Sequence, residues 1–160
     1  MRLSWFLVGL LLVFALPDPA HAYVSPTTGA AFVQGIQRPF DKPERNWLPG
    51  HRGVDLAAPP GSPIRAAETG EVVFAGSIAG KPTISIQHGD GIRTTYQPVH
   101  PHVAAGMSVG SGQVIGTLAG SEGLHWGALQ AKDDYINPLS LLDAPTIRLK
   151  PVDAPDQKPL

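Results

Sequence analysis

A histidine and an aspartate stand four residues apart in the stretch HRGVDLAAPPGSP, and this pair gives the first sign of chemistry. An imidazole nitrogen and a carboxylate oxygen are both zinc ligands, each about 2 Å from the ion. In one straight strand, His51 and Asp55 would lie about 13 Å apart, too far to share an ion. A bend at Gly53 would fold His51 back over Asp55, because glycine permits such bends. The pattern alone also fits an ordinary polar turn.

A third ligand would turn this pair into a metal site. Zinc that holds one histidine and one carboxylate takes a second histidine, and catalytic sites keep a fourth position open. His125 is the best candidate, because it stands in the apolar stretch LHWGALQ, where a polar side chain needs a reason to be buried. His88 ends a predicted strand and is expected to be a hydrogen-bonded structural residue. His100 and His102 lie in a loop, where solvated histidines are common.

The elements that must position these residues are short β-type segments separated by turn residues. The segments with an apolar or alternating pattern are 71–75, 83–88, 92–96, 113–118 and 125–129. A Gly-Asp-Gly turn at 89–91 predicts a hairpin between the second and the third. Only residues 138–142 suggest a helical turn, with Pro138 at its first position. The predicted fold class is therefore all-β, an antiparallel sheet or open barrel.

The two ends of the chain differ from this middle part. Residues 1–22 combine a basic start, an apolar run and an Ala-x-Ala ending, which is typical of a secretory signal that is removed. An uncleaved membrane anchor is the alternative; after removal of the signal no membrane span is expected. Residues 23–38 are predicted to be a lead-in segment and residues 39–143 the folded domain. Residues 144–160 contain four prolines and are predicted to be a disordered tail.

Charge and composition exclude several classes of protein. The 160 residues include 12 lysines and arginines against 13 aspartates and glutamates, for a net charge of −1. A chain without a basic excess has no electrostatic footprint for nucleic acid. There is no cysteine, so disulfides contribute nothing even in an oxidising compartment.

Four motifs occur in an order that resembles the lysostaphin-type zinc endopeptidases of bacterial cell walls. They are GHRGVDLAAPPGSPIRAAETGEVVFAG, GDGIRTTY, GQVIGTL and LHWG, within a stretch from about Phe40 to Leu142. The resemblance implies a glycine-rich antiparallel sheet of the duplicated hybrid motif kind, with zinc in a groove on it. It implies His51, Asp55 and His125 as the zinc ligands and a peptidoglycan peptide as the substrate. The details look most like a divergent subgroup of secreted proteins from high-GC Gram-positive bacteria.

Two histidines that this family uses for proton transfer and oxyanion stabilisation are missing. The first corresponds to Gly123 and the second to Pro98. Glu122 neighbours Gly123, but in a strand it would point to the face opposite His125. His100 lies two residues past Pro98 and about 6.5 Å further along an extended chain. His100 is therefore the predicted proton-handling residue, with a solvated loop histidine as the alternative.

These observations predict a secreted zinc protein of the cell wall. The first hypothesis is a metalloendopeptidase that hydrolyses peptidoglycan peptide bonds. The second is a catalytically degenerate module that binds peptidoglycan, or activates another wall hydrolase, without cutting. General acid–base help is typically worth about 100- to 10,000-fold in rate. The ligand triad favours the enzyme, whereas the missing histidines favour the binding module.

Overall fold

The computed structural model describes residues 22–45 and 47–142, so residues 1–21 of the predicted signal and the predicted tail lie outside the described residues. Within that part, no helix is long and apolar enough to cross a membrane. The strands are β1 (Ile36–Arg38), β2 (Gly53–Leu56), β3 (Pro63–Arg65), β4 (Gly70–Ile78), β5 (Lys81–His88), β6 (Arg93–Gln97), β7 (Val99–Pro101), β8 (Ser108–Val109), β9 (Val114–Leu118), β10 (Leu124–Ala131) and β11 (Asp134–Ile136).

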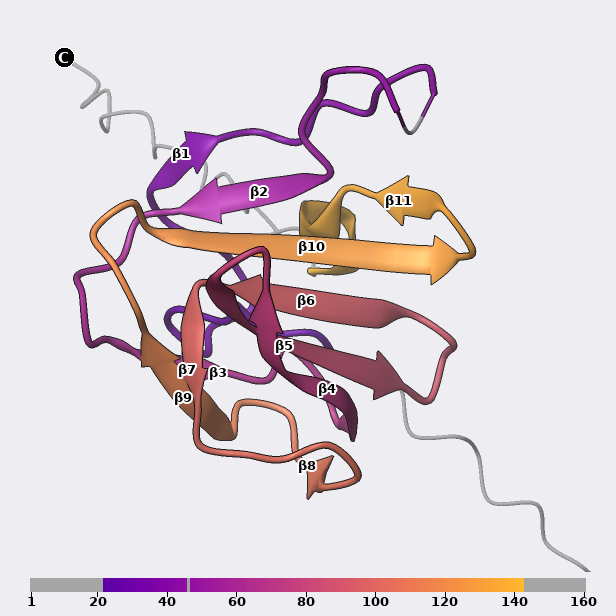
Figure 1. The fold of residues 1–160 in the computed structure, drawn as a ribbon. Coiled ribbons are helices and arrows are strands. Elements are labelled where there is room, and N and C mark those ends of the chain that lie inside the picture. The colour runs from indigo at the N-terminus through magenta and orange to yellow at the C-terminus, as the bar shows by residue number, and fades with distance from the viewer. Residues whose placement is uncertain (1–21, 46, 143–160) are drawn as a thin grey trace, which may run out of the picture.

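The strands form two antiparallel sheets (Figure 1). The larger has eight strands in the order β1-β2-β10-β6-β5-β4-β8, with β11 also paired to β10. The smaller has the order β3-β9-β7 and lies at the end of the large sheet where β10 begins. The predicted all-β class is confirmed. The helical turn expected near Pro138 is the 3₁₀ helix η1 (Pro138–Leu141), whose first turn is capped by the Asn137 side chain.

Alternation along the strands separates the core from the opposite face of the large sheet. In β10, the side chains of Leu124, Trp126 and Ala128 are buried in the core. His125 lies between them in the sequence and therefore projects from the other face, since successive strand residues point in opposite directions. The same alternation in β6 buries Tyr96 and leaves Gln97 on the face of His125. The period of two thus decides which side chains can form a site.

The predicted hairpin is confirmed, since β5 and β6 pair antiparallel around the turn at 89–91. A buried chain of hydrogen bonds lies beneath it. His88 Nδ1 is 3.0 Å from the Thr69 carbonyl, which can only accept, so His88 Nε2 accepts from the Thr94 hydroxyl at 2.7 Å. Thr94 then accepts from Tyr96 at 2.8 Å, and Tyr96 accepts from the Ala67 N–H at 2.8 Å. His88 is thus a hydrogen-bonded structural residue, as expected.

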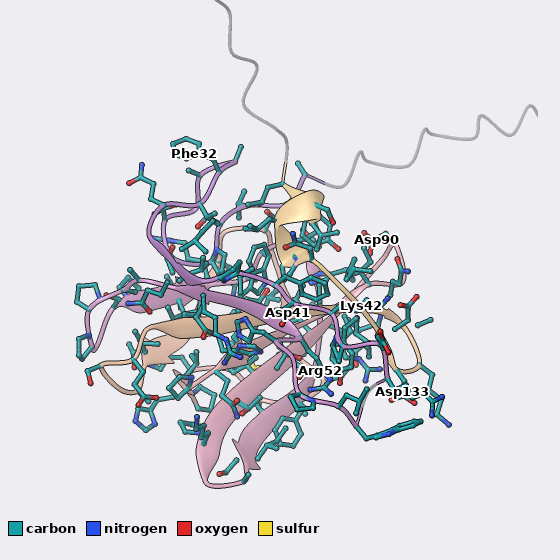
Figure 2. All side chains as sticks on the ribbon, turned by 90° about the horizontal axis from the view of Figure 1, so that it is seen from above. Phe32, Asp41, Lys42, Arg52, Asp90 and Asp133 are labelled. Carbon is teal, nitrogen blue, oxygen red and sulfur yellow. The ribbon has the colours of Figure 1, made fainter. Side chains whose placement is uncertain are left out.

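The lead-in segment packs closely on the rest of the fold. Tyr23 is only 5% exposed, and its hydroxyl donates to the Asp90 carboxylate at 2.9 Å. At the other end of the segment, β1 pairs with β2. Between these two contacts the chain forms a loop that carries Phe32 at the rim of the molecule, far from Asp133 on the opposite side (Figure 2). The segment therefore contributes both a core side chain and an edge strand.

Candidate metal centre

Strand register brings the predicted ligands together from three places in the chain. His125 of β10 lies directly opposite Asp55 of β2, and on its other side opposite Gln97 of β6. His51 precedes β2 and forms an isolated antiparallel bridge with Asp41. The chain bends at Arg52, between His51 and the strand, and Figure 2 shows Asp41 and Arg52 close together at this point.

The three donor atoms converge on one point. Asp55 Oδ1 is 3.0 Å from His51 Nε2 and 2.9 Å from His125 Nδ1, and the two nitrogens are 3.1 Å apart. Two ligands at about 2.0–2.1 Å from a tetrahedral zinc ion lie about 3.3 Å from each other. The observed separations are close to that value, so the triad has the geometry of three ligands of one ion.

The three ligand atoms have too few protons to hydrogen-bond to one another, which favours a bound cation. His51 Nδ1 is 2.7 Å from the Pro39 carbonyl oxygen, which can only accept, so Nδ1 carries the proton. In the neutral imidazole His51 Nε2 then presents a lone pair. That lone pair faces another acceptor, Asp55 Oδ1, at 3.0 Å. With both imidazoles neutral, at most one proton, on His125 Nδ1, is available for the three mutual contacts, and a bound cation would satisfy all three ligand atoms.

The environment favours the neutral form of His125. Burial lowers the pKa of its imidazole, and the neighbouring Asp55 carboxylate opposes this shift without reversing it. A metal ligand must be the unprotonated imidazole. Burial therefore keeps His125 in the form that coordination requires.

Gly53 serves a different purpose from the predicted one. Its φ is not positive, and the bend falls at Arg52, so the expectation that Gly53 itself makes the bend is wrong. A Cβ atom at Gly53 would lie 2.7 Å from His125 Cε1 and 2.6 Å from the Trp126 carbonyl oxygen. Ordinary Cβ contacts are 3.4 Å or longer. The glycine is needed because the His125 ring lies directly over it.

The triad lies in an open cleft that extends in two directions. A first cavity of about 320 Å³ is lined by the triad and by Arg38, Lys81, Gln97, Pro98, Glu122 and Gly123. A second cavity of about 440 Å³ shares His51, Gln97 and His125 with the first. It extends over Ser85, Thr95 and Gly127, along β5, β6 and β10. The two predicted histidine ligands therefore lie at the junction of the two cavities, and Asp55 lines the first of them.

The position of one missing histidine, Gly123, is filled tightly. Gly123 has a φ of +84° and precedes β10, which begins at Leu124. A Cβ there would lie 2.4 Å from Gln37 Oε1 and 2.5 Å from the Leu56 carbonyl oxygen. Gly123 is therefore a turn residue just before β10 and not part of the strand that carries His125. The same turn redirects Glu122, which lines the cleft although a regular strand would have pointed it away.

His100 is placed elsewhere. It is an exposed residue of β7 and pairs with Thr117 of β9 in the small sheet. It is not among the residues that line either cavity at the triad. Its role as the proton-handling residue stays a prediction. Sequence reasoning missed Arg38 and Lys81, for which no local motif gives a signal.

Residues 49–138 match the model of peptidase family M23. The uncharacterized protein Rv2891 of Mycobacterium tuberculosis is 47% identical over 127 residues, covering 73% of this chain and 51% of that protein. The DD-carboxypeptidase/endopeptidase Mpg of Neisseria meningitidis is 35% identical over 98 residues, covering 57% of this chain and 22% of Mpg. The chain thus spans about half the length of Rv2891.

A solved structure has a similar fold. Csd3 of Helicobacter pylori superposes with a TM-score of 0.63 and 28% identity, over 81% of this chain and 37% of Csd3. The resemblance to lysostaphin-type peptidases is confirmed by the family match and by these relatives. Members of the family are zinc metallopeptidases, and this chain retains a His/Asp/His group. The chain therefore belongs to peptidase family M23 and forms a cell-wall-peptidase-like module of the lysostaphin type.

Proposed function

We propose that this protein is an extracytoplasmic zinc metalloendopeptidase that hydrolyses peptide bonds of peptidoglycan. The observation that carries the proposal is the convergence of His51 Nε2, Asp55 Oδ1 and His125 Nδ1 within 3.1 Å of one another in an open cleft. The name of Mpg, a DD-carboxypeptidase/endopeptidase, supports peptidoglycan peptides as the substrate class.

The residues of the chain divide the work of such a site. His51 and His125 would hold the ion as neutral imidazoles and Asp55 as a carboxylate. The Pro39 carbonyl fixes the tautomer of His51 by accepting its Nδ1 proton. An ion held there supplies a Lewis acid for the scissile carbonyl and a water of lowered pKa.

The shape of the cleft favours cleavage within a chain. The two cavities meet at His51, Gln97 and His125, so a peptide that crosses the triad can extend on both sides of it. Gln97 is held at this junction because its amide donates to the Thr83 hydroxyl at 2.9 Å. A carboxypeptidase needs space for only a terminal residue on one side. An endopeptidase needs both sides, which this cleft provides.

The proton must be moved by a side chain other than the two missing histidines. Glu122 lines the cleft with the triad, and a carboxylate can accept a proton from an attacking water. His100 is the residue predicted from the sequence, and it lies on β7 outside both cavities. We assign the role to Glu122 in preference to His100, and paired variants of the two residues separate the assignments.

A second candidate function is a module that binds peptidoglycan, or activates another wall hydrolase, without cutting. The packing around Gly123 favours it, because this position cannot accept the histidine of the family. The intact ligand triad favours the enzyme, since a module that only binds has no need of three converging ligands.

Secretion is part of the proposal. It rests on the signal pattern of residues 1–22 and on the peptidoglycan substrate, which lies outside the cytoplasm. Sequencing the N-terminus of the exported protein tests this part: a start at Tyr23 is expected, and retention of Met1 would contradict it.

The test of the proposed activity is a digest of purified peptidoglycan read by mass spectrometry. Zinc-loaded protein should release new peptide fragments, and protein treated with a chelator should release none until zinc is restored. If zinc-loaded protein binds the insoluble peptidoglycan but releases no fragment, the binding-module function takes the place of the enzyme.

A further inference from the structure

Two cations flank the triad from opposite sides of the cleft. Arg38 of β1 is the register partner of Asp55, and β1 is two strands away from β10. Lys81 begins β5, which is two strands from β10 in the other direction. Neighbouring strands lie about 4.8 Å apart and each residue advances about 3.3 Å along a strand, so the backbone of Arg38 is about 10 Å from that of His125 and the backbone of Lys81, two residues off the His125 row, about 12 Å. Both side chains are long enough to cover much of this distance, and both line the first cavity.

Neither cation is engaged by the part of the chain that the structure describes. The ion pairs found there join Lys42 to Asp134 and the two triad histidines to Asp55. No hydrogen bond of the Arg38 guanidinium or the Lys81 ammonium occurs among the described residues. Lys81 is close enough to His125 to act on it electrostatically. Two unpaired cations thus face one cleft in a chain whose net charge is −1.

The charge balance of the cleft is positive. The cationic side chains that line the two cavities are Arg38, Arg52, Lys81 and Arg93. The carboxylates that line them are Asp55 and Glu122. Asp55 would be neutralised by a divalent ion, which leaves Glu122 against Arg38, Lys81 and Arg93 even when Arg52, which has partners of its own, is not counted. A cleft lined by one sign of charge concentrates ligands of the opposite sign.

We infer that Arg38 and Lys81 make this cleft selective for peptides that carry a free carboxylate close to the scissile bond. The inference rests on the proposed function and adds the substrate class, an acidic peptide. Arginine binds a carboxylate through two parallel N–H bonds, and lysine adds a point charge. The carboxylate can be the C-terminus of the peptide or an acidic side chain, because both present the same group.

The test compares peptides that differ only in this group. One peptide has a free C-terminus and a free acidic side chain, and two derivatives carry a carboxamide at one or the other. Zinc-loaded wild type should prefer the free peptide to at least one derivative by about tenfold or more in kcat/KM, and the derivative that loses activity identifies the carboxylate. The preference should shrink as salt is raised, because salt screens exposed charges.

A charge-matched pair of double variants assigns the preference. Arg38→Gln with Lys81→Met should reduce it to about twofold or less while zinc content stays at the wild-type level. Arg45→Gln with Lys132→Met removes two exposed cations that line neither of these cavities and should leave the preference unchanged. Equal preference in the first double variant and the wild type would overturn the inference. So would an equal loss in both double variants, which would point to net charge alone.

A binding measurement tests the carboxylate selectivity independently of whether the protein cuts peptides. Calorimetric titration of zinc-loaded protein with the same three peptides, each with its scissile amide replaced by a reduced bond, measures recognition without cleavage. If the protein cuts nothing but binds the free peptide about tenfold more tightly than an amidated one, the proposed enzyme fails and the carboxylate selectivity stands. If the three peptides bind equally, the selectivity fails whatever the protein cuts.

Discussion

Replacing Gly53 by alanine should displace a metal ligand without touching any ligand residue. The added Cβ would lie 2.7 Å from His125 Cε1 and 2.6 Å from the Trp126 carbonyl oxygen, whereas ordinary contacts begin at 3.4 Å, so the ring and the adjoining part of β10 must move away from β2 by at least about 3.4 − 2.7 = 0.7 Å. Zinc–ligand distances tolerate about 0.2 Å. Changes in the groups that orient metal ligands typically cost about 10- to 100-fold in affinity, and we expect a loss in this range for zinc.

The register partner of Gly53 provides a matched control. Gly127 of β10 lies opposite it. The atoms nearest to a Cβ at Gly127 would be the Arg52 carbonyl oxygen at 3.4 Å and His125 Nε2 at 3.8 Å, which are ordinary contact distances. Gly127→Ala should therefore bind zinc like the wild type. Competition titrations against a chromophoric chelator measure the affinity, and far-UV circular dichroism confirms that both variants are folded. A folded Gly53→Ala protein with wild-type zinc affinity would refute the role assigned to the glycine.

Three further predictions concern the proton, the turn before β10 and the core. Glu122→Gln should lower kcat on peptidoglycan peptides by about 100-fold or more, whereas His100→Ala should leave it within about threefold; the reverse result would assign the proton to His100. Gly123→Ala should destabilise the fold more than Gly61→Ala in urea titrations, because both glycines have positive φ but only Gly123 has neighbours within 4 Å; equal losses would contradict the contacts at Gly123. Tyr96→Phe should cost about 1–3 kcal/mol of unfolding free energy and leave zinc affinity unchanged, because it leaves buried polar partners unpaired; no loss of stability would contradict the hydrogen-bond chain.

Local patterns predicted the parts of the site that are close in sequence. The apolar stretch LHWGALQ singled out His125 as a polar residue that needs a reason for its position, and the structure places it in β10 beside Asp55. The His-x-x-x-Asp spacing required a bend, which occurs one residue before the predicted position. The hairpin and the 3₁₀ turn were also predicted, because glycine and proline determine them locally.

Long-range pairing determines the rest of the site, and no local pattern reports it. Arg38 lies beside the triad only because β1 pairs with β2, and its segment had been interpreted as a lead-in. Lys81 lies near the triad only because β5 pairs with β6 and β6 pairs with β10. Glu122 lines the cleft because of the left-handed backbone at Gly123, which a regular strand would not have.

The most direct test of the metal site as a working peptidase is hydrolysis of peptidoglycan in water enriched in oxygen-18. Zinc-loaded wild type should release fragments whose new carboxyl group contains one heavy oxygen atom. The His125→Ala variant should bind little zinc and release no labelled fragment, because it retains only two of the three ligands. Labelled fragments in equal amounts from both proteins, or none from the zinc-loaded wild type, would contradict a zinc peptidase built on His51, Asp55 and His125.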